Sequence, residues 1–160
     1  MSGHNGMTKE QIDAFVAAWY LALDQHAPTD QMAGLVSDDV QMIFPEKTLH
    51  GKSDFLAWCI GGTYSDGDQA PGVYNIFFDE NHNVVSVEAQ VSGDGADLDV
   101  VVAWQASMFI PPAAKSKRVS LDAIQKWTVK ASDQNPYGMV VTSYNAMAKP
   151  FVYTPGFARL

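Results

Sequence analysis

Apolar residues in the first part of the chain recur at intervals of three and four, the spacing of one face of a helix. This spacing predicts a long helix over residues 8–26. Thr8 is expected to begin it, because its hydroxyl and the side chain of Gln11 can form a capping box with two free N–H groups. The predicted buried face consists of Ile12, Phe15, Val16, Trp19, Tyr20 and Leu23.

Two shorter helices and one strand are expected before Gly67. Apolar positions predict helices over residues 28–36 and 52–60. Alternating polar and apolar positions predict a strand over residues 40–44, which follows a turn at residues 38–39.

After Gly67, runs of β-branched and aromatic residues alternate with turn residues, which predicts an antiparallel meander. Strands over residues 73–79 and 84–92 are expected to flank a hairpin turn at residues 80–83. Further strands are expected over residues 98–110, 118–130 and 137–147.

These elements predict an α+β domain over residues 8–148, with three N-terminal helices packed on a highly curved, mostly antiparallel sheet. Residues 1–7 are expected to form a flexible N-terminal segment. Residues 149–160 form a C-terminal tail whose aromatic residues would cover a pocket or contact a partner. A sheet that helices cover on one side leaves a hollow, where small ligands usually bind.

Several short motifs occur in a characteristic order along this chain. They are Ser37-Asp38-Asp39-Val40, Phe44-Pro45, Leu49-His50-Gly51, Phe55 and Trp58. In this order the chain resembles the NTF2-like superfamily, also called SnoaL-like, over residues 8–148. The resemblance implies a cone-shaped fold that commonly pairs through its sheet. Members include ketosteroid isomerase, scytalone dehydratase, limonene epoxide hydrolase and polyketide cyclases, and also nuclear transport factor 2, which is not catalytic.

The resemblance to ketosteroid isomerase assigns three positions. Tyr20 matches the helical tyrosine that donates a hydrogen bond, and Gln125 stands where the isomerase has a protonated aspartic acid. Phe44 stands where the isomerase has its aspartate base. Because phenylalanine cannot accept a proton, the isomerase mechanism is not expected at this position.

Gln125 is a lone polar residue in an apolar row of its predicted strand. Burying an amide without partners costs about 1–3 kcal/mol, so either the protein or a ligand must supply a hydrogen bond. The same two alternatives hold for the hydroxyl of Tyr20, which lies on the buried face of the first helix. The row around Gln125 consists of Val119, Leu121, Ala123, Trp127 and Val129.

A pocket under the helices would be lined mainly by aromatic side chains. Thr142 is included because it shares the parity of Tyr144 on the last strand. His50 and His26 are the only histidines expected near the pocket, because His82 is placed in the hairpin turn. Of these two, only His50 is expected to act as a base, since the position of His26 near a helix C-terminus is explained by the helix dipole. The predicted ligand-binding residues are Tyr20, Phe44, Trp58, Trp104, Met108, Gln125, Trp127, Thr142 and Tyr144, and the predicted catalytic residues are Tyr20 and His50.

Composition narrows the functional classes. The chain of 160 residues has a net charge of -8, which argues against a surface for nucleic acid or anionic membranes. A single cysteine, Cys59, excludes an internal disulfide and a cysteine-based zinc site. No apolar run can span a bilayer and no secretory leader is visible, so a cytoplasmic setting is expected. The Gly/Asp-rich segment at 93–99 lacks the glutamate of a calcium loop, and we expect no metal and no cofactor.

Two functions follow from this pattern. The first is a neutral, apolar pocket that binds a small hydrophobic molecule without turnover. The alternative is an isomerase, dehydratase, cyclase or hydrolase that acts by proton transfer, although the inward strand positions carry no carboxylate. Asp24 or Asp99 could reach the pocket from a loop. We also expect a homodimer through the sheet, because the second face of strand 98–110 is apolar.

Overall fold

The computed structural model describes residues 7–110 and 115–146, and the predictions for the C-terminal tail lie outside these residues. The long first helix is confirmed: Thr8 caps α1, and its capping box with Gln11 is present. In the described part of the chain, no helix has the length and apolar character needed to cross a membrane. The helices are α1 (Lys9–Asp24), α2 (Thr29–Ala33), α3 (Gly51–Ile60) and α4 (Val73–Ile76).

Six strands form one strongly bent sheet in the order β2-β1-β8-β7-β6-β5, and β3 pairs with β4 in a separate hairpin. All neighbours in the large sheet are antiparallel except β1 and β8, which are parallel. The strands are β1 (Val36–Ile43), β2 (Thr48–His50), β3 (Gly62–Thr63), β4 (Gln69–Ala70), β5 (Phe77–Ser92), β6 (Gly95–Ile110), β7 (Lys115–Ala131) and β8 (Met139–Ala146). The predicted α+β architecture is therefore confirmed.

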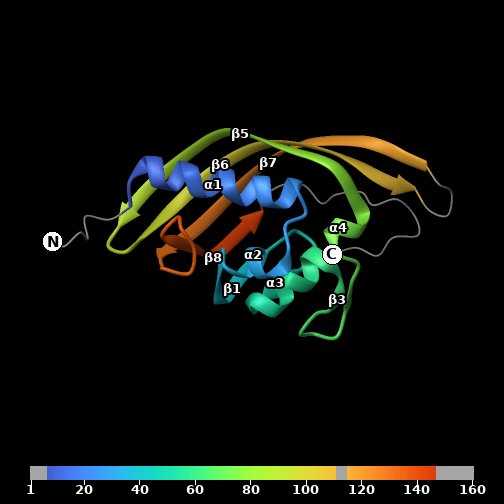
Figure 1. Ribbon diagram of the computed structural model, residues 1–160, viewed down its shortest axis with the longest axis horizontal. Coiled ribbons are helices and arrows are strands. Elements are labelled where there is room, and N and C mark those ends of the chain that lie inside the picture. Colours follow the sequence, from blue (N-terminus) through green and yellow to red (C-terminus); the bar gives the residue numbers. More distant parts are fainter. Residues whose placement is uncertain (1–6, 111–114, 147–160) are drawn as a thin grey trace.

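Helix α1 lies along one face of the long strands β5, β6 and β7 (Figure 1). Its predicted buried stripe packs on this face, which we call the inner face. Phe15, Trp19 and Tyr20 each contact the ring of Trp127 on β7, at centroid distances of 6.4, 5.3 and 5.8 Å. The core therefore lies between α1 and the sheet. The side chains on the inner face of β7 are the ones against which α1 packs.

The predicted hairpin at residues 80–83 is wrong. These residues belong to the single long strand β5, and the chain reverses at Gly93-Asp94 instead. Asp79 has a φ of +49°, and the pairing with β6 shifts between Phe78 and Asn81, so an irregularity replaces the turn. Glu80 and His82 therefore lie on a strand that runs beside α1.

Other predicted boundaries also change. Residues 38–39 lie within β1 and do not form a turn, and residues 73–76 form α4 and not a strand. Lys115 begins β7, three residues before the predicted start of this strand at residue 118. Met7, expected in the flexible segment, packs in the core. The short strands β2, β3 and β4 were not predicted, because two or three residues carry no periodicity.

Gly72 offers a test of the contact between the end of α3 and the start of α4. Its φ is +82°, and a Cβ atom there would lie 2.4 Å from the backbone nitrogen of Gly61. We expect Gly72→Ala to lower the free energy of unfolding by about 3 kcal/mol or more, measured by urea denaturation. Gly67→Ala is the matched control, because its φ is +93° but the space around it is open, so about 1 kcal/mol is expected. Equal losses would contradict the close approach.

Candidate functional site

The structure brings four of the predicted site residues together. The Tyr20 hydroxyl donates to Oε1 of Gln125, and Nε1 of Trp127 donates to the same oxygen at 3.1 Å. The hydroxyl of Tyr144 also contacts Tyr20 and Gln125. Gln125 is only 6% exposed, so protein side chains supply the partners of its buried carbonyl oxygen. Burial raises the pKa of Tyr20 well above its usual value, and the phenol therefore stays protonated.

Phe44, Trp58 and Tyr144 belong to a closed circuit of five aromatic rings between α1, α3 and the sheet. Trp19 and Phe55 complete it, and successive ring centroids are 5.4 to 6.1 Å apart. The indole N–H groups of Trp19 and Trp58 are buried and have no hydrogen-bond partner among the described residues. These predicted lining residues therefore pack on one another.

The remaining predicted residues lie elsewhere. Thr142 lines a groove on the outer face of the sheet, opposite α1, because the pairing of β7 and β8 shifts register between Thr128 and Val129. The parity that linked Thr142 to Tyr144 is therefore wrong. His50 is exposed at the start of α3, where its backbone N–H donates to the Asp54 carboxylate. Met108 is fully buried on β6 opposite Phe77.

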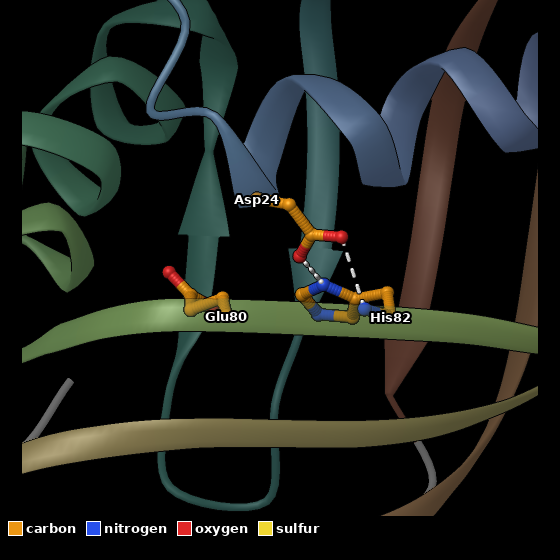
Figure 2. Close-up of side chains that lie close together, drawn as sticks. All are labelled: Asp24, Glu80 and His82. Carbon is orange, nitrogen blue, oxygen red and sulfur yellow. Dashed lines mark hydrogen bonds and ion pairs between the residues drawn. The ribbon is translucent and has the colours of Figure 1, made fainter.

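A pair of polar residues that the sequence did not predict joins the end of α1 to β5. Asp24 accepts two hydrogen bonds from His82 (Figure 2). One comes from the backbone N–H at 3.0 Å, and the other joins Nδ1 of the ring to Oδ1 of Asp24 at 2.5 Å. The imidazole also stacks on the ring of Tyr20, at a centroid distance of 4.8 Å. The His82 ring is thus fixed from two sides.

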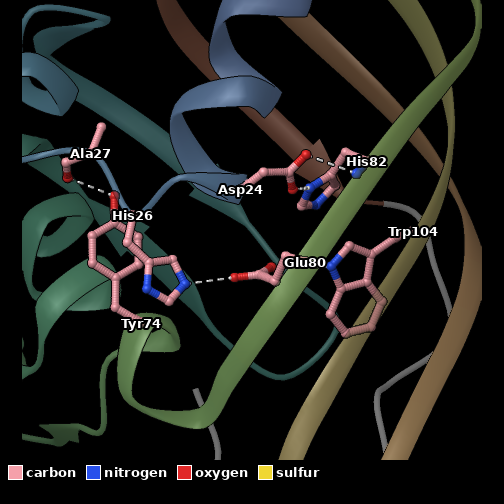
Figure 3. A network of polar contacts seen from close by, with 7 residues as sticks. All are labelled: Asp24, His26, Ala27, Tyr74, Glu80, His82 and Trp104. Atoms are coloured by element: carbon pink, nitrogen blue, oxygen red, sulfur yellow. Dashed lines mark hydrogen bonds and ion pairs between the residues drawn. The ribbon is translucent and has the colours of Figure 1, made fainter.

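Glu80 is the centre of a second group, which lies beside the first (Figure 3). Its Oε1 is 3.1 Å from Nε2 of His26, and its Oε2 accepts a hydrogen bond of 3.1 Å from Nε1 of Trp104. The side chain of Glu80 is 6% exposed, whereas that of His26 is 30% exposed and stacks on Tyr74. A nearly buried carboxyl group is therefore linked through a histidine to the surface.

The backbone is unusual on both sides of this contact. Among the described residues, only His26 and Asp79 combine a side chain with a positive φ, at +51° and +49°. His26 follows the last turn of α1, a position that glycine commonly takes. Asp79 directly precedes Glu80. Such conformations concentrate at functional sites, which supports a role for the His26–Glu80 contact.

The electrostatics of the site centre on Glu80. Burial raises its pKa, while hydrogen bonds from Trp104 and His26 and the nearby charge of His82 act in the opposite direction. Cys59 lies close to Glu80 and Tyr74, and burial raises the pKa of its thiol to about 12. The thiol therefore stays neutral, as expected for an inert buried cysteine.

Asp24, Glu80 and His82 each place one oxygen or nitrogen atom within 4.8 Å of the other two. Such a spacing suits either a metal ion or the movement of protons between the groups. Nδ1 of His82 and both oxygens of Glu80 already contact hydrogen-bond partners. The arrangement therefore fits proton transfer better than metal binding.

The sequence contained a signal for this site that was misread. Glu80 and His82 are two residues apart, the spacing that places side chains on one face of a strand. They stand in the run Asp-Glu-Asn-His-Asn, whose composition is typical of turns, and the turn interpretation removed both residues from the inner face. Asp24, expected to reach the site from a loop, lies at the end of α1.

Gln125→Leu tests the buried polar contacts under α1. The change removes the acceptor of two buried donors, from Tyr20 and Trp127, and we expect the free energy of unfolding to fall by about 2–4 kcal/mol. Lys126→Gln is the control, because this exposed neighbour forms a surface ion pair with Asp99, and its loss should change stability by less than about 1 kcal/mol. A fully stable Gln125→Leu protein would mean that these donors do not need the amide.

No protein-family model matches this sequence, and no curated protein matches it either. Solved structures do match it. A proposed aromatic-ring hydroxylase from Novosphingobium aromaticivorans is 13% identical, with a TM-score of 0.66, and 86% of this chain and 85% of that chain are covered. A proposed dehydratase of the NTF2-like family from Streptomyces avermitilis is 15% identical, with a TM-score of 0.63 and coverages of 86% and 93%.

A third match is a proposed calcium/calmodulin-dependent protein kinase II association domain from Xanthomonas campestris. It is 12% identical, with a TM-score of 0.58, and 91% of each chain is covered. Other matching structures are described as NTF2-like or as having a cystatin-like fold. These low identities establish the architecture and not an activity. The chain has the cystatin-like α+β fold of the NTF2-like superfamily.

Proposed function

We propose that this chain binds a small, largely hydrophobic organic molecule and moves a proton on it by general acid–base catalysis. The observation that carries the proposal is the hydrogen-bonded Asp24–His82 pair, which lies beside Glu80. Its ring nitrogen and carboxylate oxygen are 2.5 Å apart, and atoms of the three residues lie within 4.8 Å of one another. The Asp24–His82 pair and Glu80 can therefore contact the same small molecule from one side.

In this proposal His82 is the base. When Nδ1–H of the ring donates to Asp24, the lone pair of Nε2 is available to accept a proton from carbon. The Asp24 carboxylate then stabilises the imidazolium that forms. Stacking on Tyr20 keeps the ring in place without taking part in proton transfer.

Glu80 is the second group. It shares a hydrogen bond with His26, so this pair can hold one proton and deliver it from Glu80 to an oxygen or a carbon of the substrate. Removal of a C–H proton next to a carbonyl by His82, with return of a proton by Glu80, gives an isomerisation. In a dehydration, His82 again removes the C–H proton, and Glu80 donates its proton to a hydroxyl group that leaves as water. Dehydration is the activity suggested for the Streptomyces avermitilis protein. Phe44 cannot be the base, and this site does not need it.

Exchange of hydrogen for deuterium tests the proposal without a known substrate. A panel of cyclic ketones in D2O would be followed by ¹H NMR, since a base beside a carbonyl exchanges the neighbouring protons. We expect exchange with the wild-type protein, and a decrease of about 10²–10⁴-fold for His82→Gln and for Asp24→Asn. Asp122→Asn, on the exposed side of β7, is the control and should behave as wild type.

His50→Gln separates this site from the base predicted by sequence. Loss of exchange in His50→Gln but not in His82→Gln would overturn the assignment. Ketones that raise the melting temperature of the wild-type protein without any exchange would instead favour the neutral binding domain. In that case the protein would bind the ketone without transferring a proton.

We further propose that two copies pair through the outer face of the sheet, in the cytoplasm. Ile124 on β7 is 56% exposed on this face and pairs with Val101 of β6, which is half-buried. An exposed isoleucine in the middle of a sheet face favours a second protein copy that covers it. The description of the Xanthomonas campestris structure as an association domain supports an assembly built on this fold.

Ile124→Lys should shift the protein from dimer to monomer, because a charge at the centre of the contact has to be desolvated. The mass would be measured by light scattering after gel filtration, with at least a tenfold weaker dimer expected. Leu21→Lys is the matched control, since Leu21 is 55% exposed on α1, on the opposite side of the sheet. A monomer from Leu21→Lys alone would place the interface on the helices.

A further inference from the structure

We propose that Trp104 is a positioning residue whose indole N–H fixes the orientation of the Glu80 carboxyl group. This inference concerns the same site as the proposed function and names a residue on which the proton transfer depends. Trp104 was expected to line a pocket with its apolar ring. The structure shows that its indole N–H also donates a hydrogen bond to Glu80.

The geometry divides the two oxygens of Glu80 between two donors. Oε2 accepts the indole N–H of Trp104 at 3.1 Å, and Oε1 lies 3.1 Å from Nε2 of His26 (Figure 3). A carboxyl group held at both oxygens cannot rotate without losing both contacts. The two donors differ, however, because an indole keeps its proton and a histidine does not.

Trp104 is the more rigid of the two donors. It stands on β6 directly opposite His82 in the register with β5, and it is 9% exposed. Its ring packs edge-on against Phe77, at a centroid distance of 5.0 Å and an angle of 87°. His26, in contrast, is part of the surface. The contact from Trp104 is therefore the one that comes from a rigid donor without a titratable proton.

Other groups also face Glu80 from the elements that pack around it. The thiol of Cys59 and the phenol of Tyr74 are neutral, since the pKa of each is raised by burial. They therefore add no charge that would compete with the indole contact. The titratable groups around Glu80 are Asp24 and His26 at the end of α1, Cys59 on α3, Tyr74 on α4 and His82 on β5.

The direction of the effect follows from this set. Burial raises the pKa of Glu80, and the hydrogen bond from Trp104 is the strongest of the contacts that lower it. Without the indole N–H, fewer contacts would oppose the effect of burial, and the pKa of Glu80 would rise further. Glu80 would then hold its proton more tightly and deliver it less readily to a substrate.

The experiment replaces the donor and titrates Glu80 directly. In protein labelled with ¹³C-glutamate, the Glu80 carboxyl signal is assigned by its loss in Glu80→Gln. We expect its titration midpoint in Trp104→Phe to lie roughly one pH unit or more above that of wild type. Benzothienylalanine at position 104 keeps the shape of indole without its N–H, and serves if the phenylalanine variant folds poorly. Trp19→Phe is the matched control, because the N–H of this buried indole has no described partner.

The dependence of the free energy of unfolding on pH provides a second test. The pKa of Glu80 is raised in the folded protein, so its contribution is present at low pH and is lost as the pH rises through the folded value. Trp104→Phe should therefore lose more stability at neutral pH than at pH 4, and Trp19→Phe should lose the same at both. An unchanged midpoint in the Trp104 variants would overturn the inference. Because neither measurement needs a substrate, absence of ketone exchange would count against the proposed function alone.

Discussion

The interior of this protein depends on one constraint: the polar edges of Tyr20 and Trp127 are buried under α1 and need a hydrogen-bond acceptor there. Gln125 meets this need at the centre of β7, because one carbonyl oxygen accepts from both Tyr20 and Trp127. A neutral amide can do this without the large desolvation penalty of a buried carboxylate. The helix can therefore lie flat on the inner face of the sheet, with rings packed on rings.

Tyr20 connects this neutral interior to the charged site. Its hydroxyl is held by Gln125, and its ring stacks on His82 at 4.8 Å. The position of the imidazole is thus set by Asp24 on one side and, through a phenol, by the middle of β7 on the other. Two polar clusters that differ in chemistry share one rigid side chain, which links the packing of the core to the geometry of the proposed base.

The sequence was sufficient where its pattern was regular. The capping box of α1 followed from Thr8 and Gln11, and the inward position of Gln125 followed from parity, because β7 is regular up to Thr128. The partners of Gln125 could not be predicted, since they depend on how α1 lies across the sheet. Irregular strands, in contrast, break the parity on which such a prediction rests. The register shift in β8 moved Thr142 to the other face, and the irregularity at residue 79 made a strand look like a turn.

The misread segment is also the one where local preferences conflict with the fold. A polar run forms a strand, and His26 adopts a conformation that suits glycine. Glycine at position 26 would relieve the backbone, and an apolar residue at position 80 would avoid a buried carboxyl. Either change would remove half of the His26–Glu80 contact. Local preferences usually agree with the global structure, and conflicts that coincide in space mark the places where function sets the sequence. Here the two unusual backbone positions and the buried acid meet at one hydrogen bond, which argues that chemistry rather than packing maintains it.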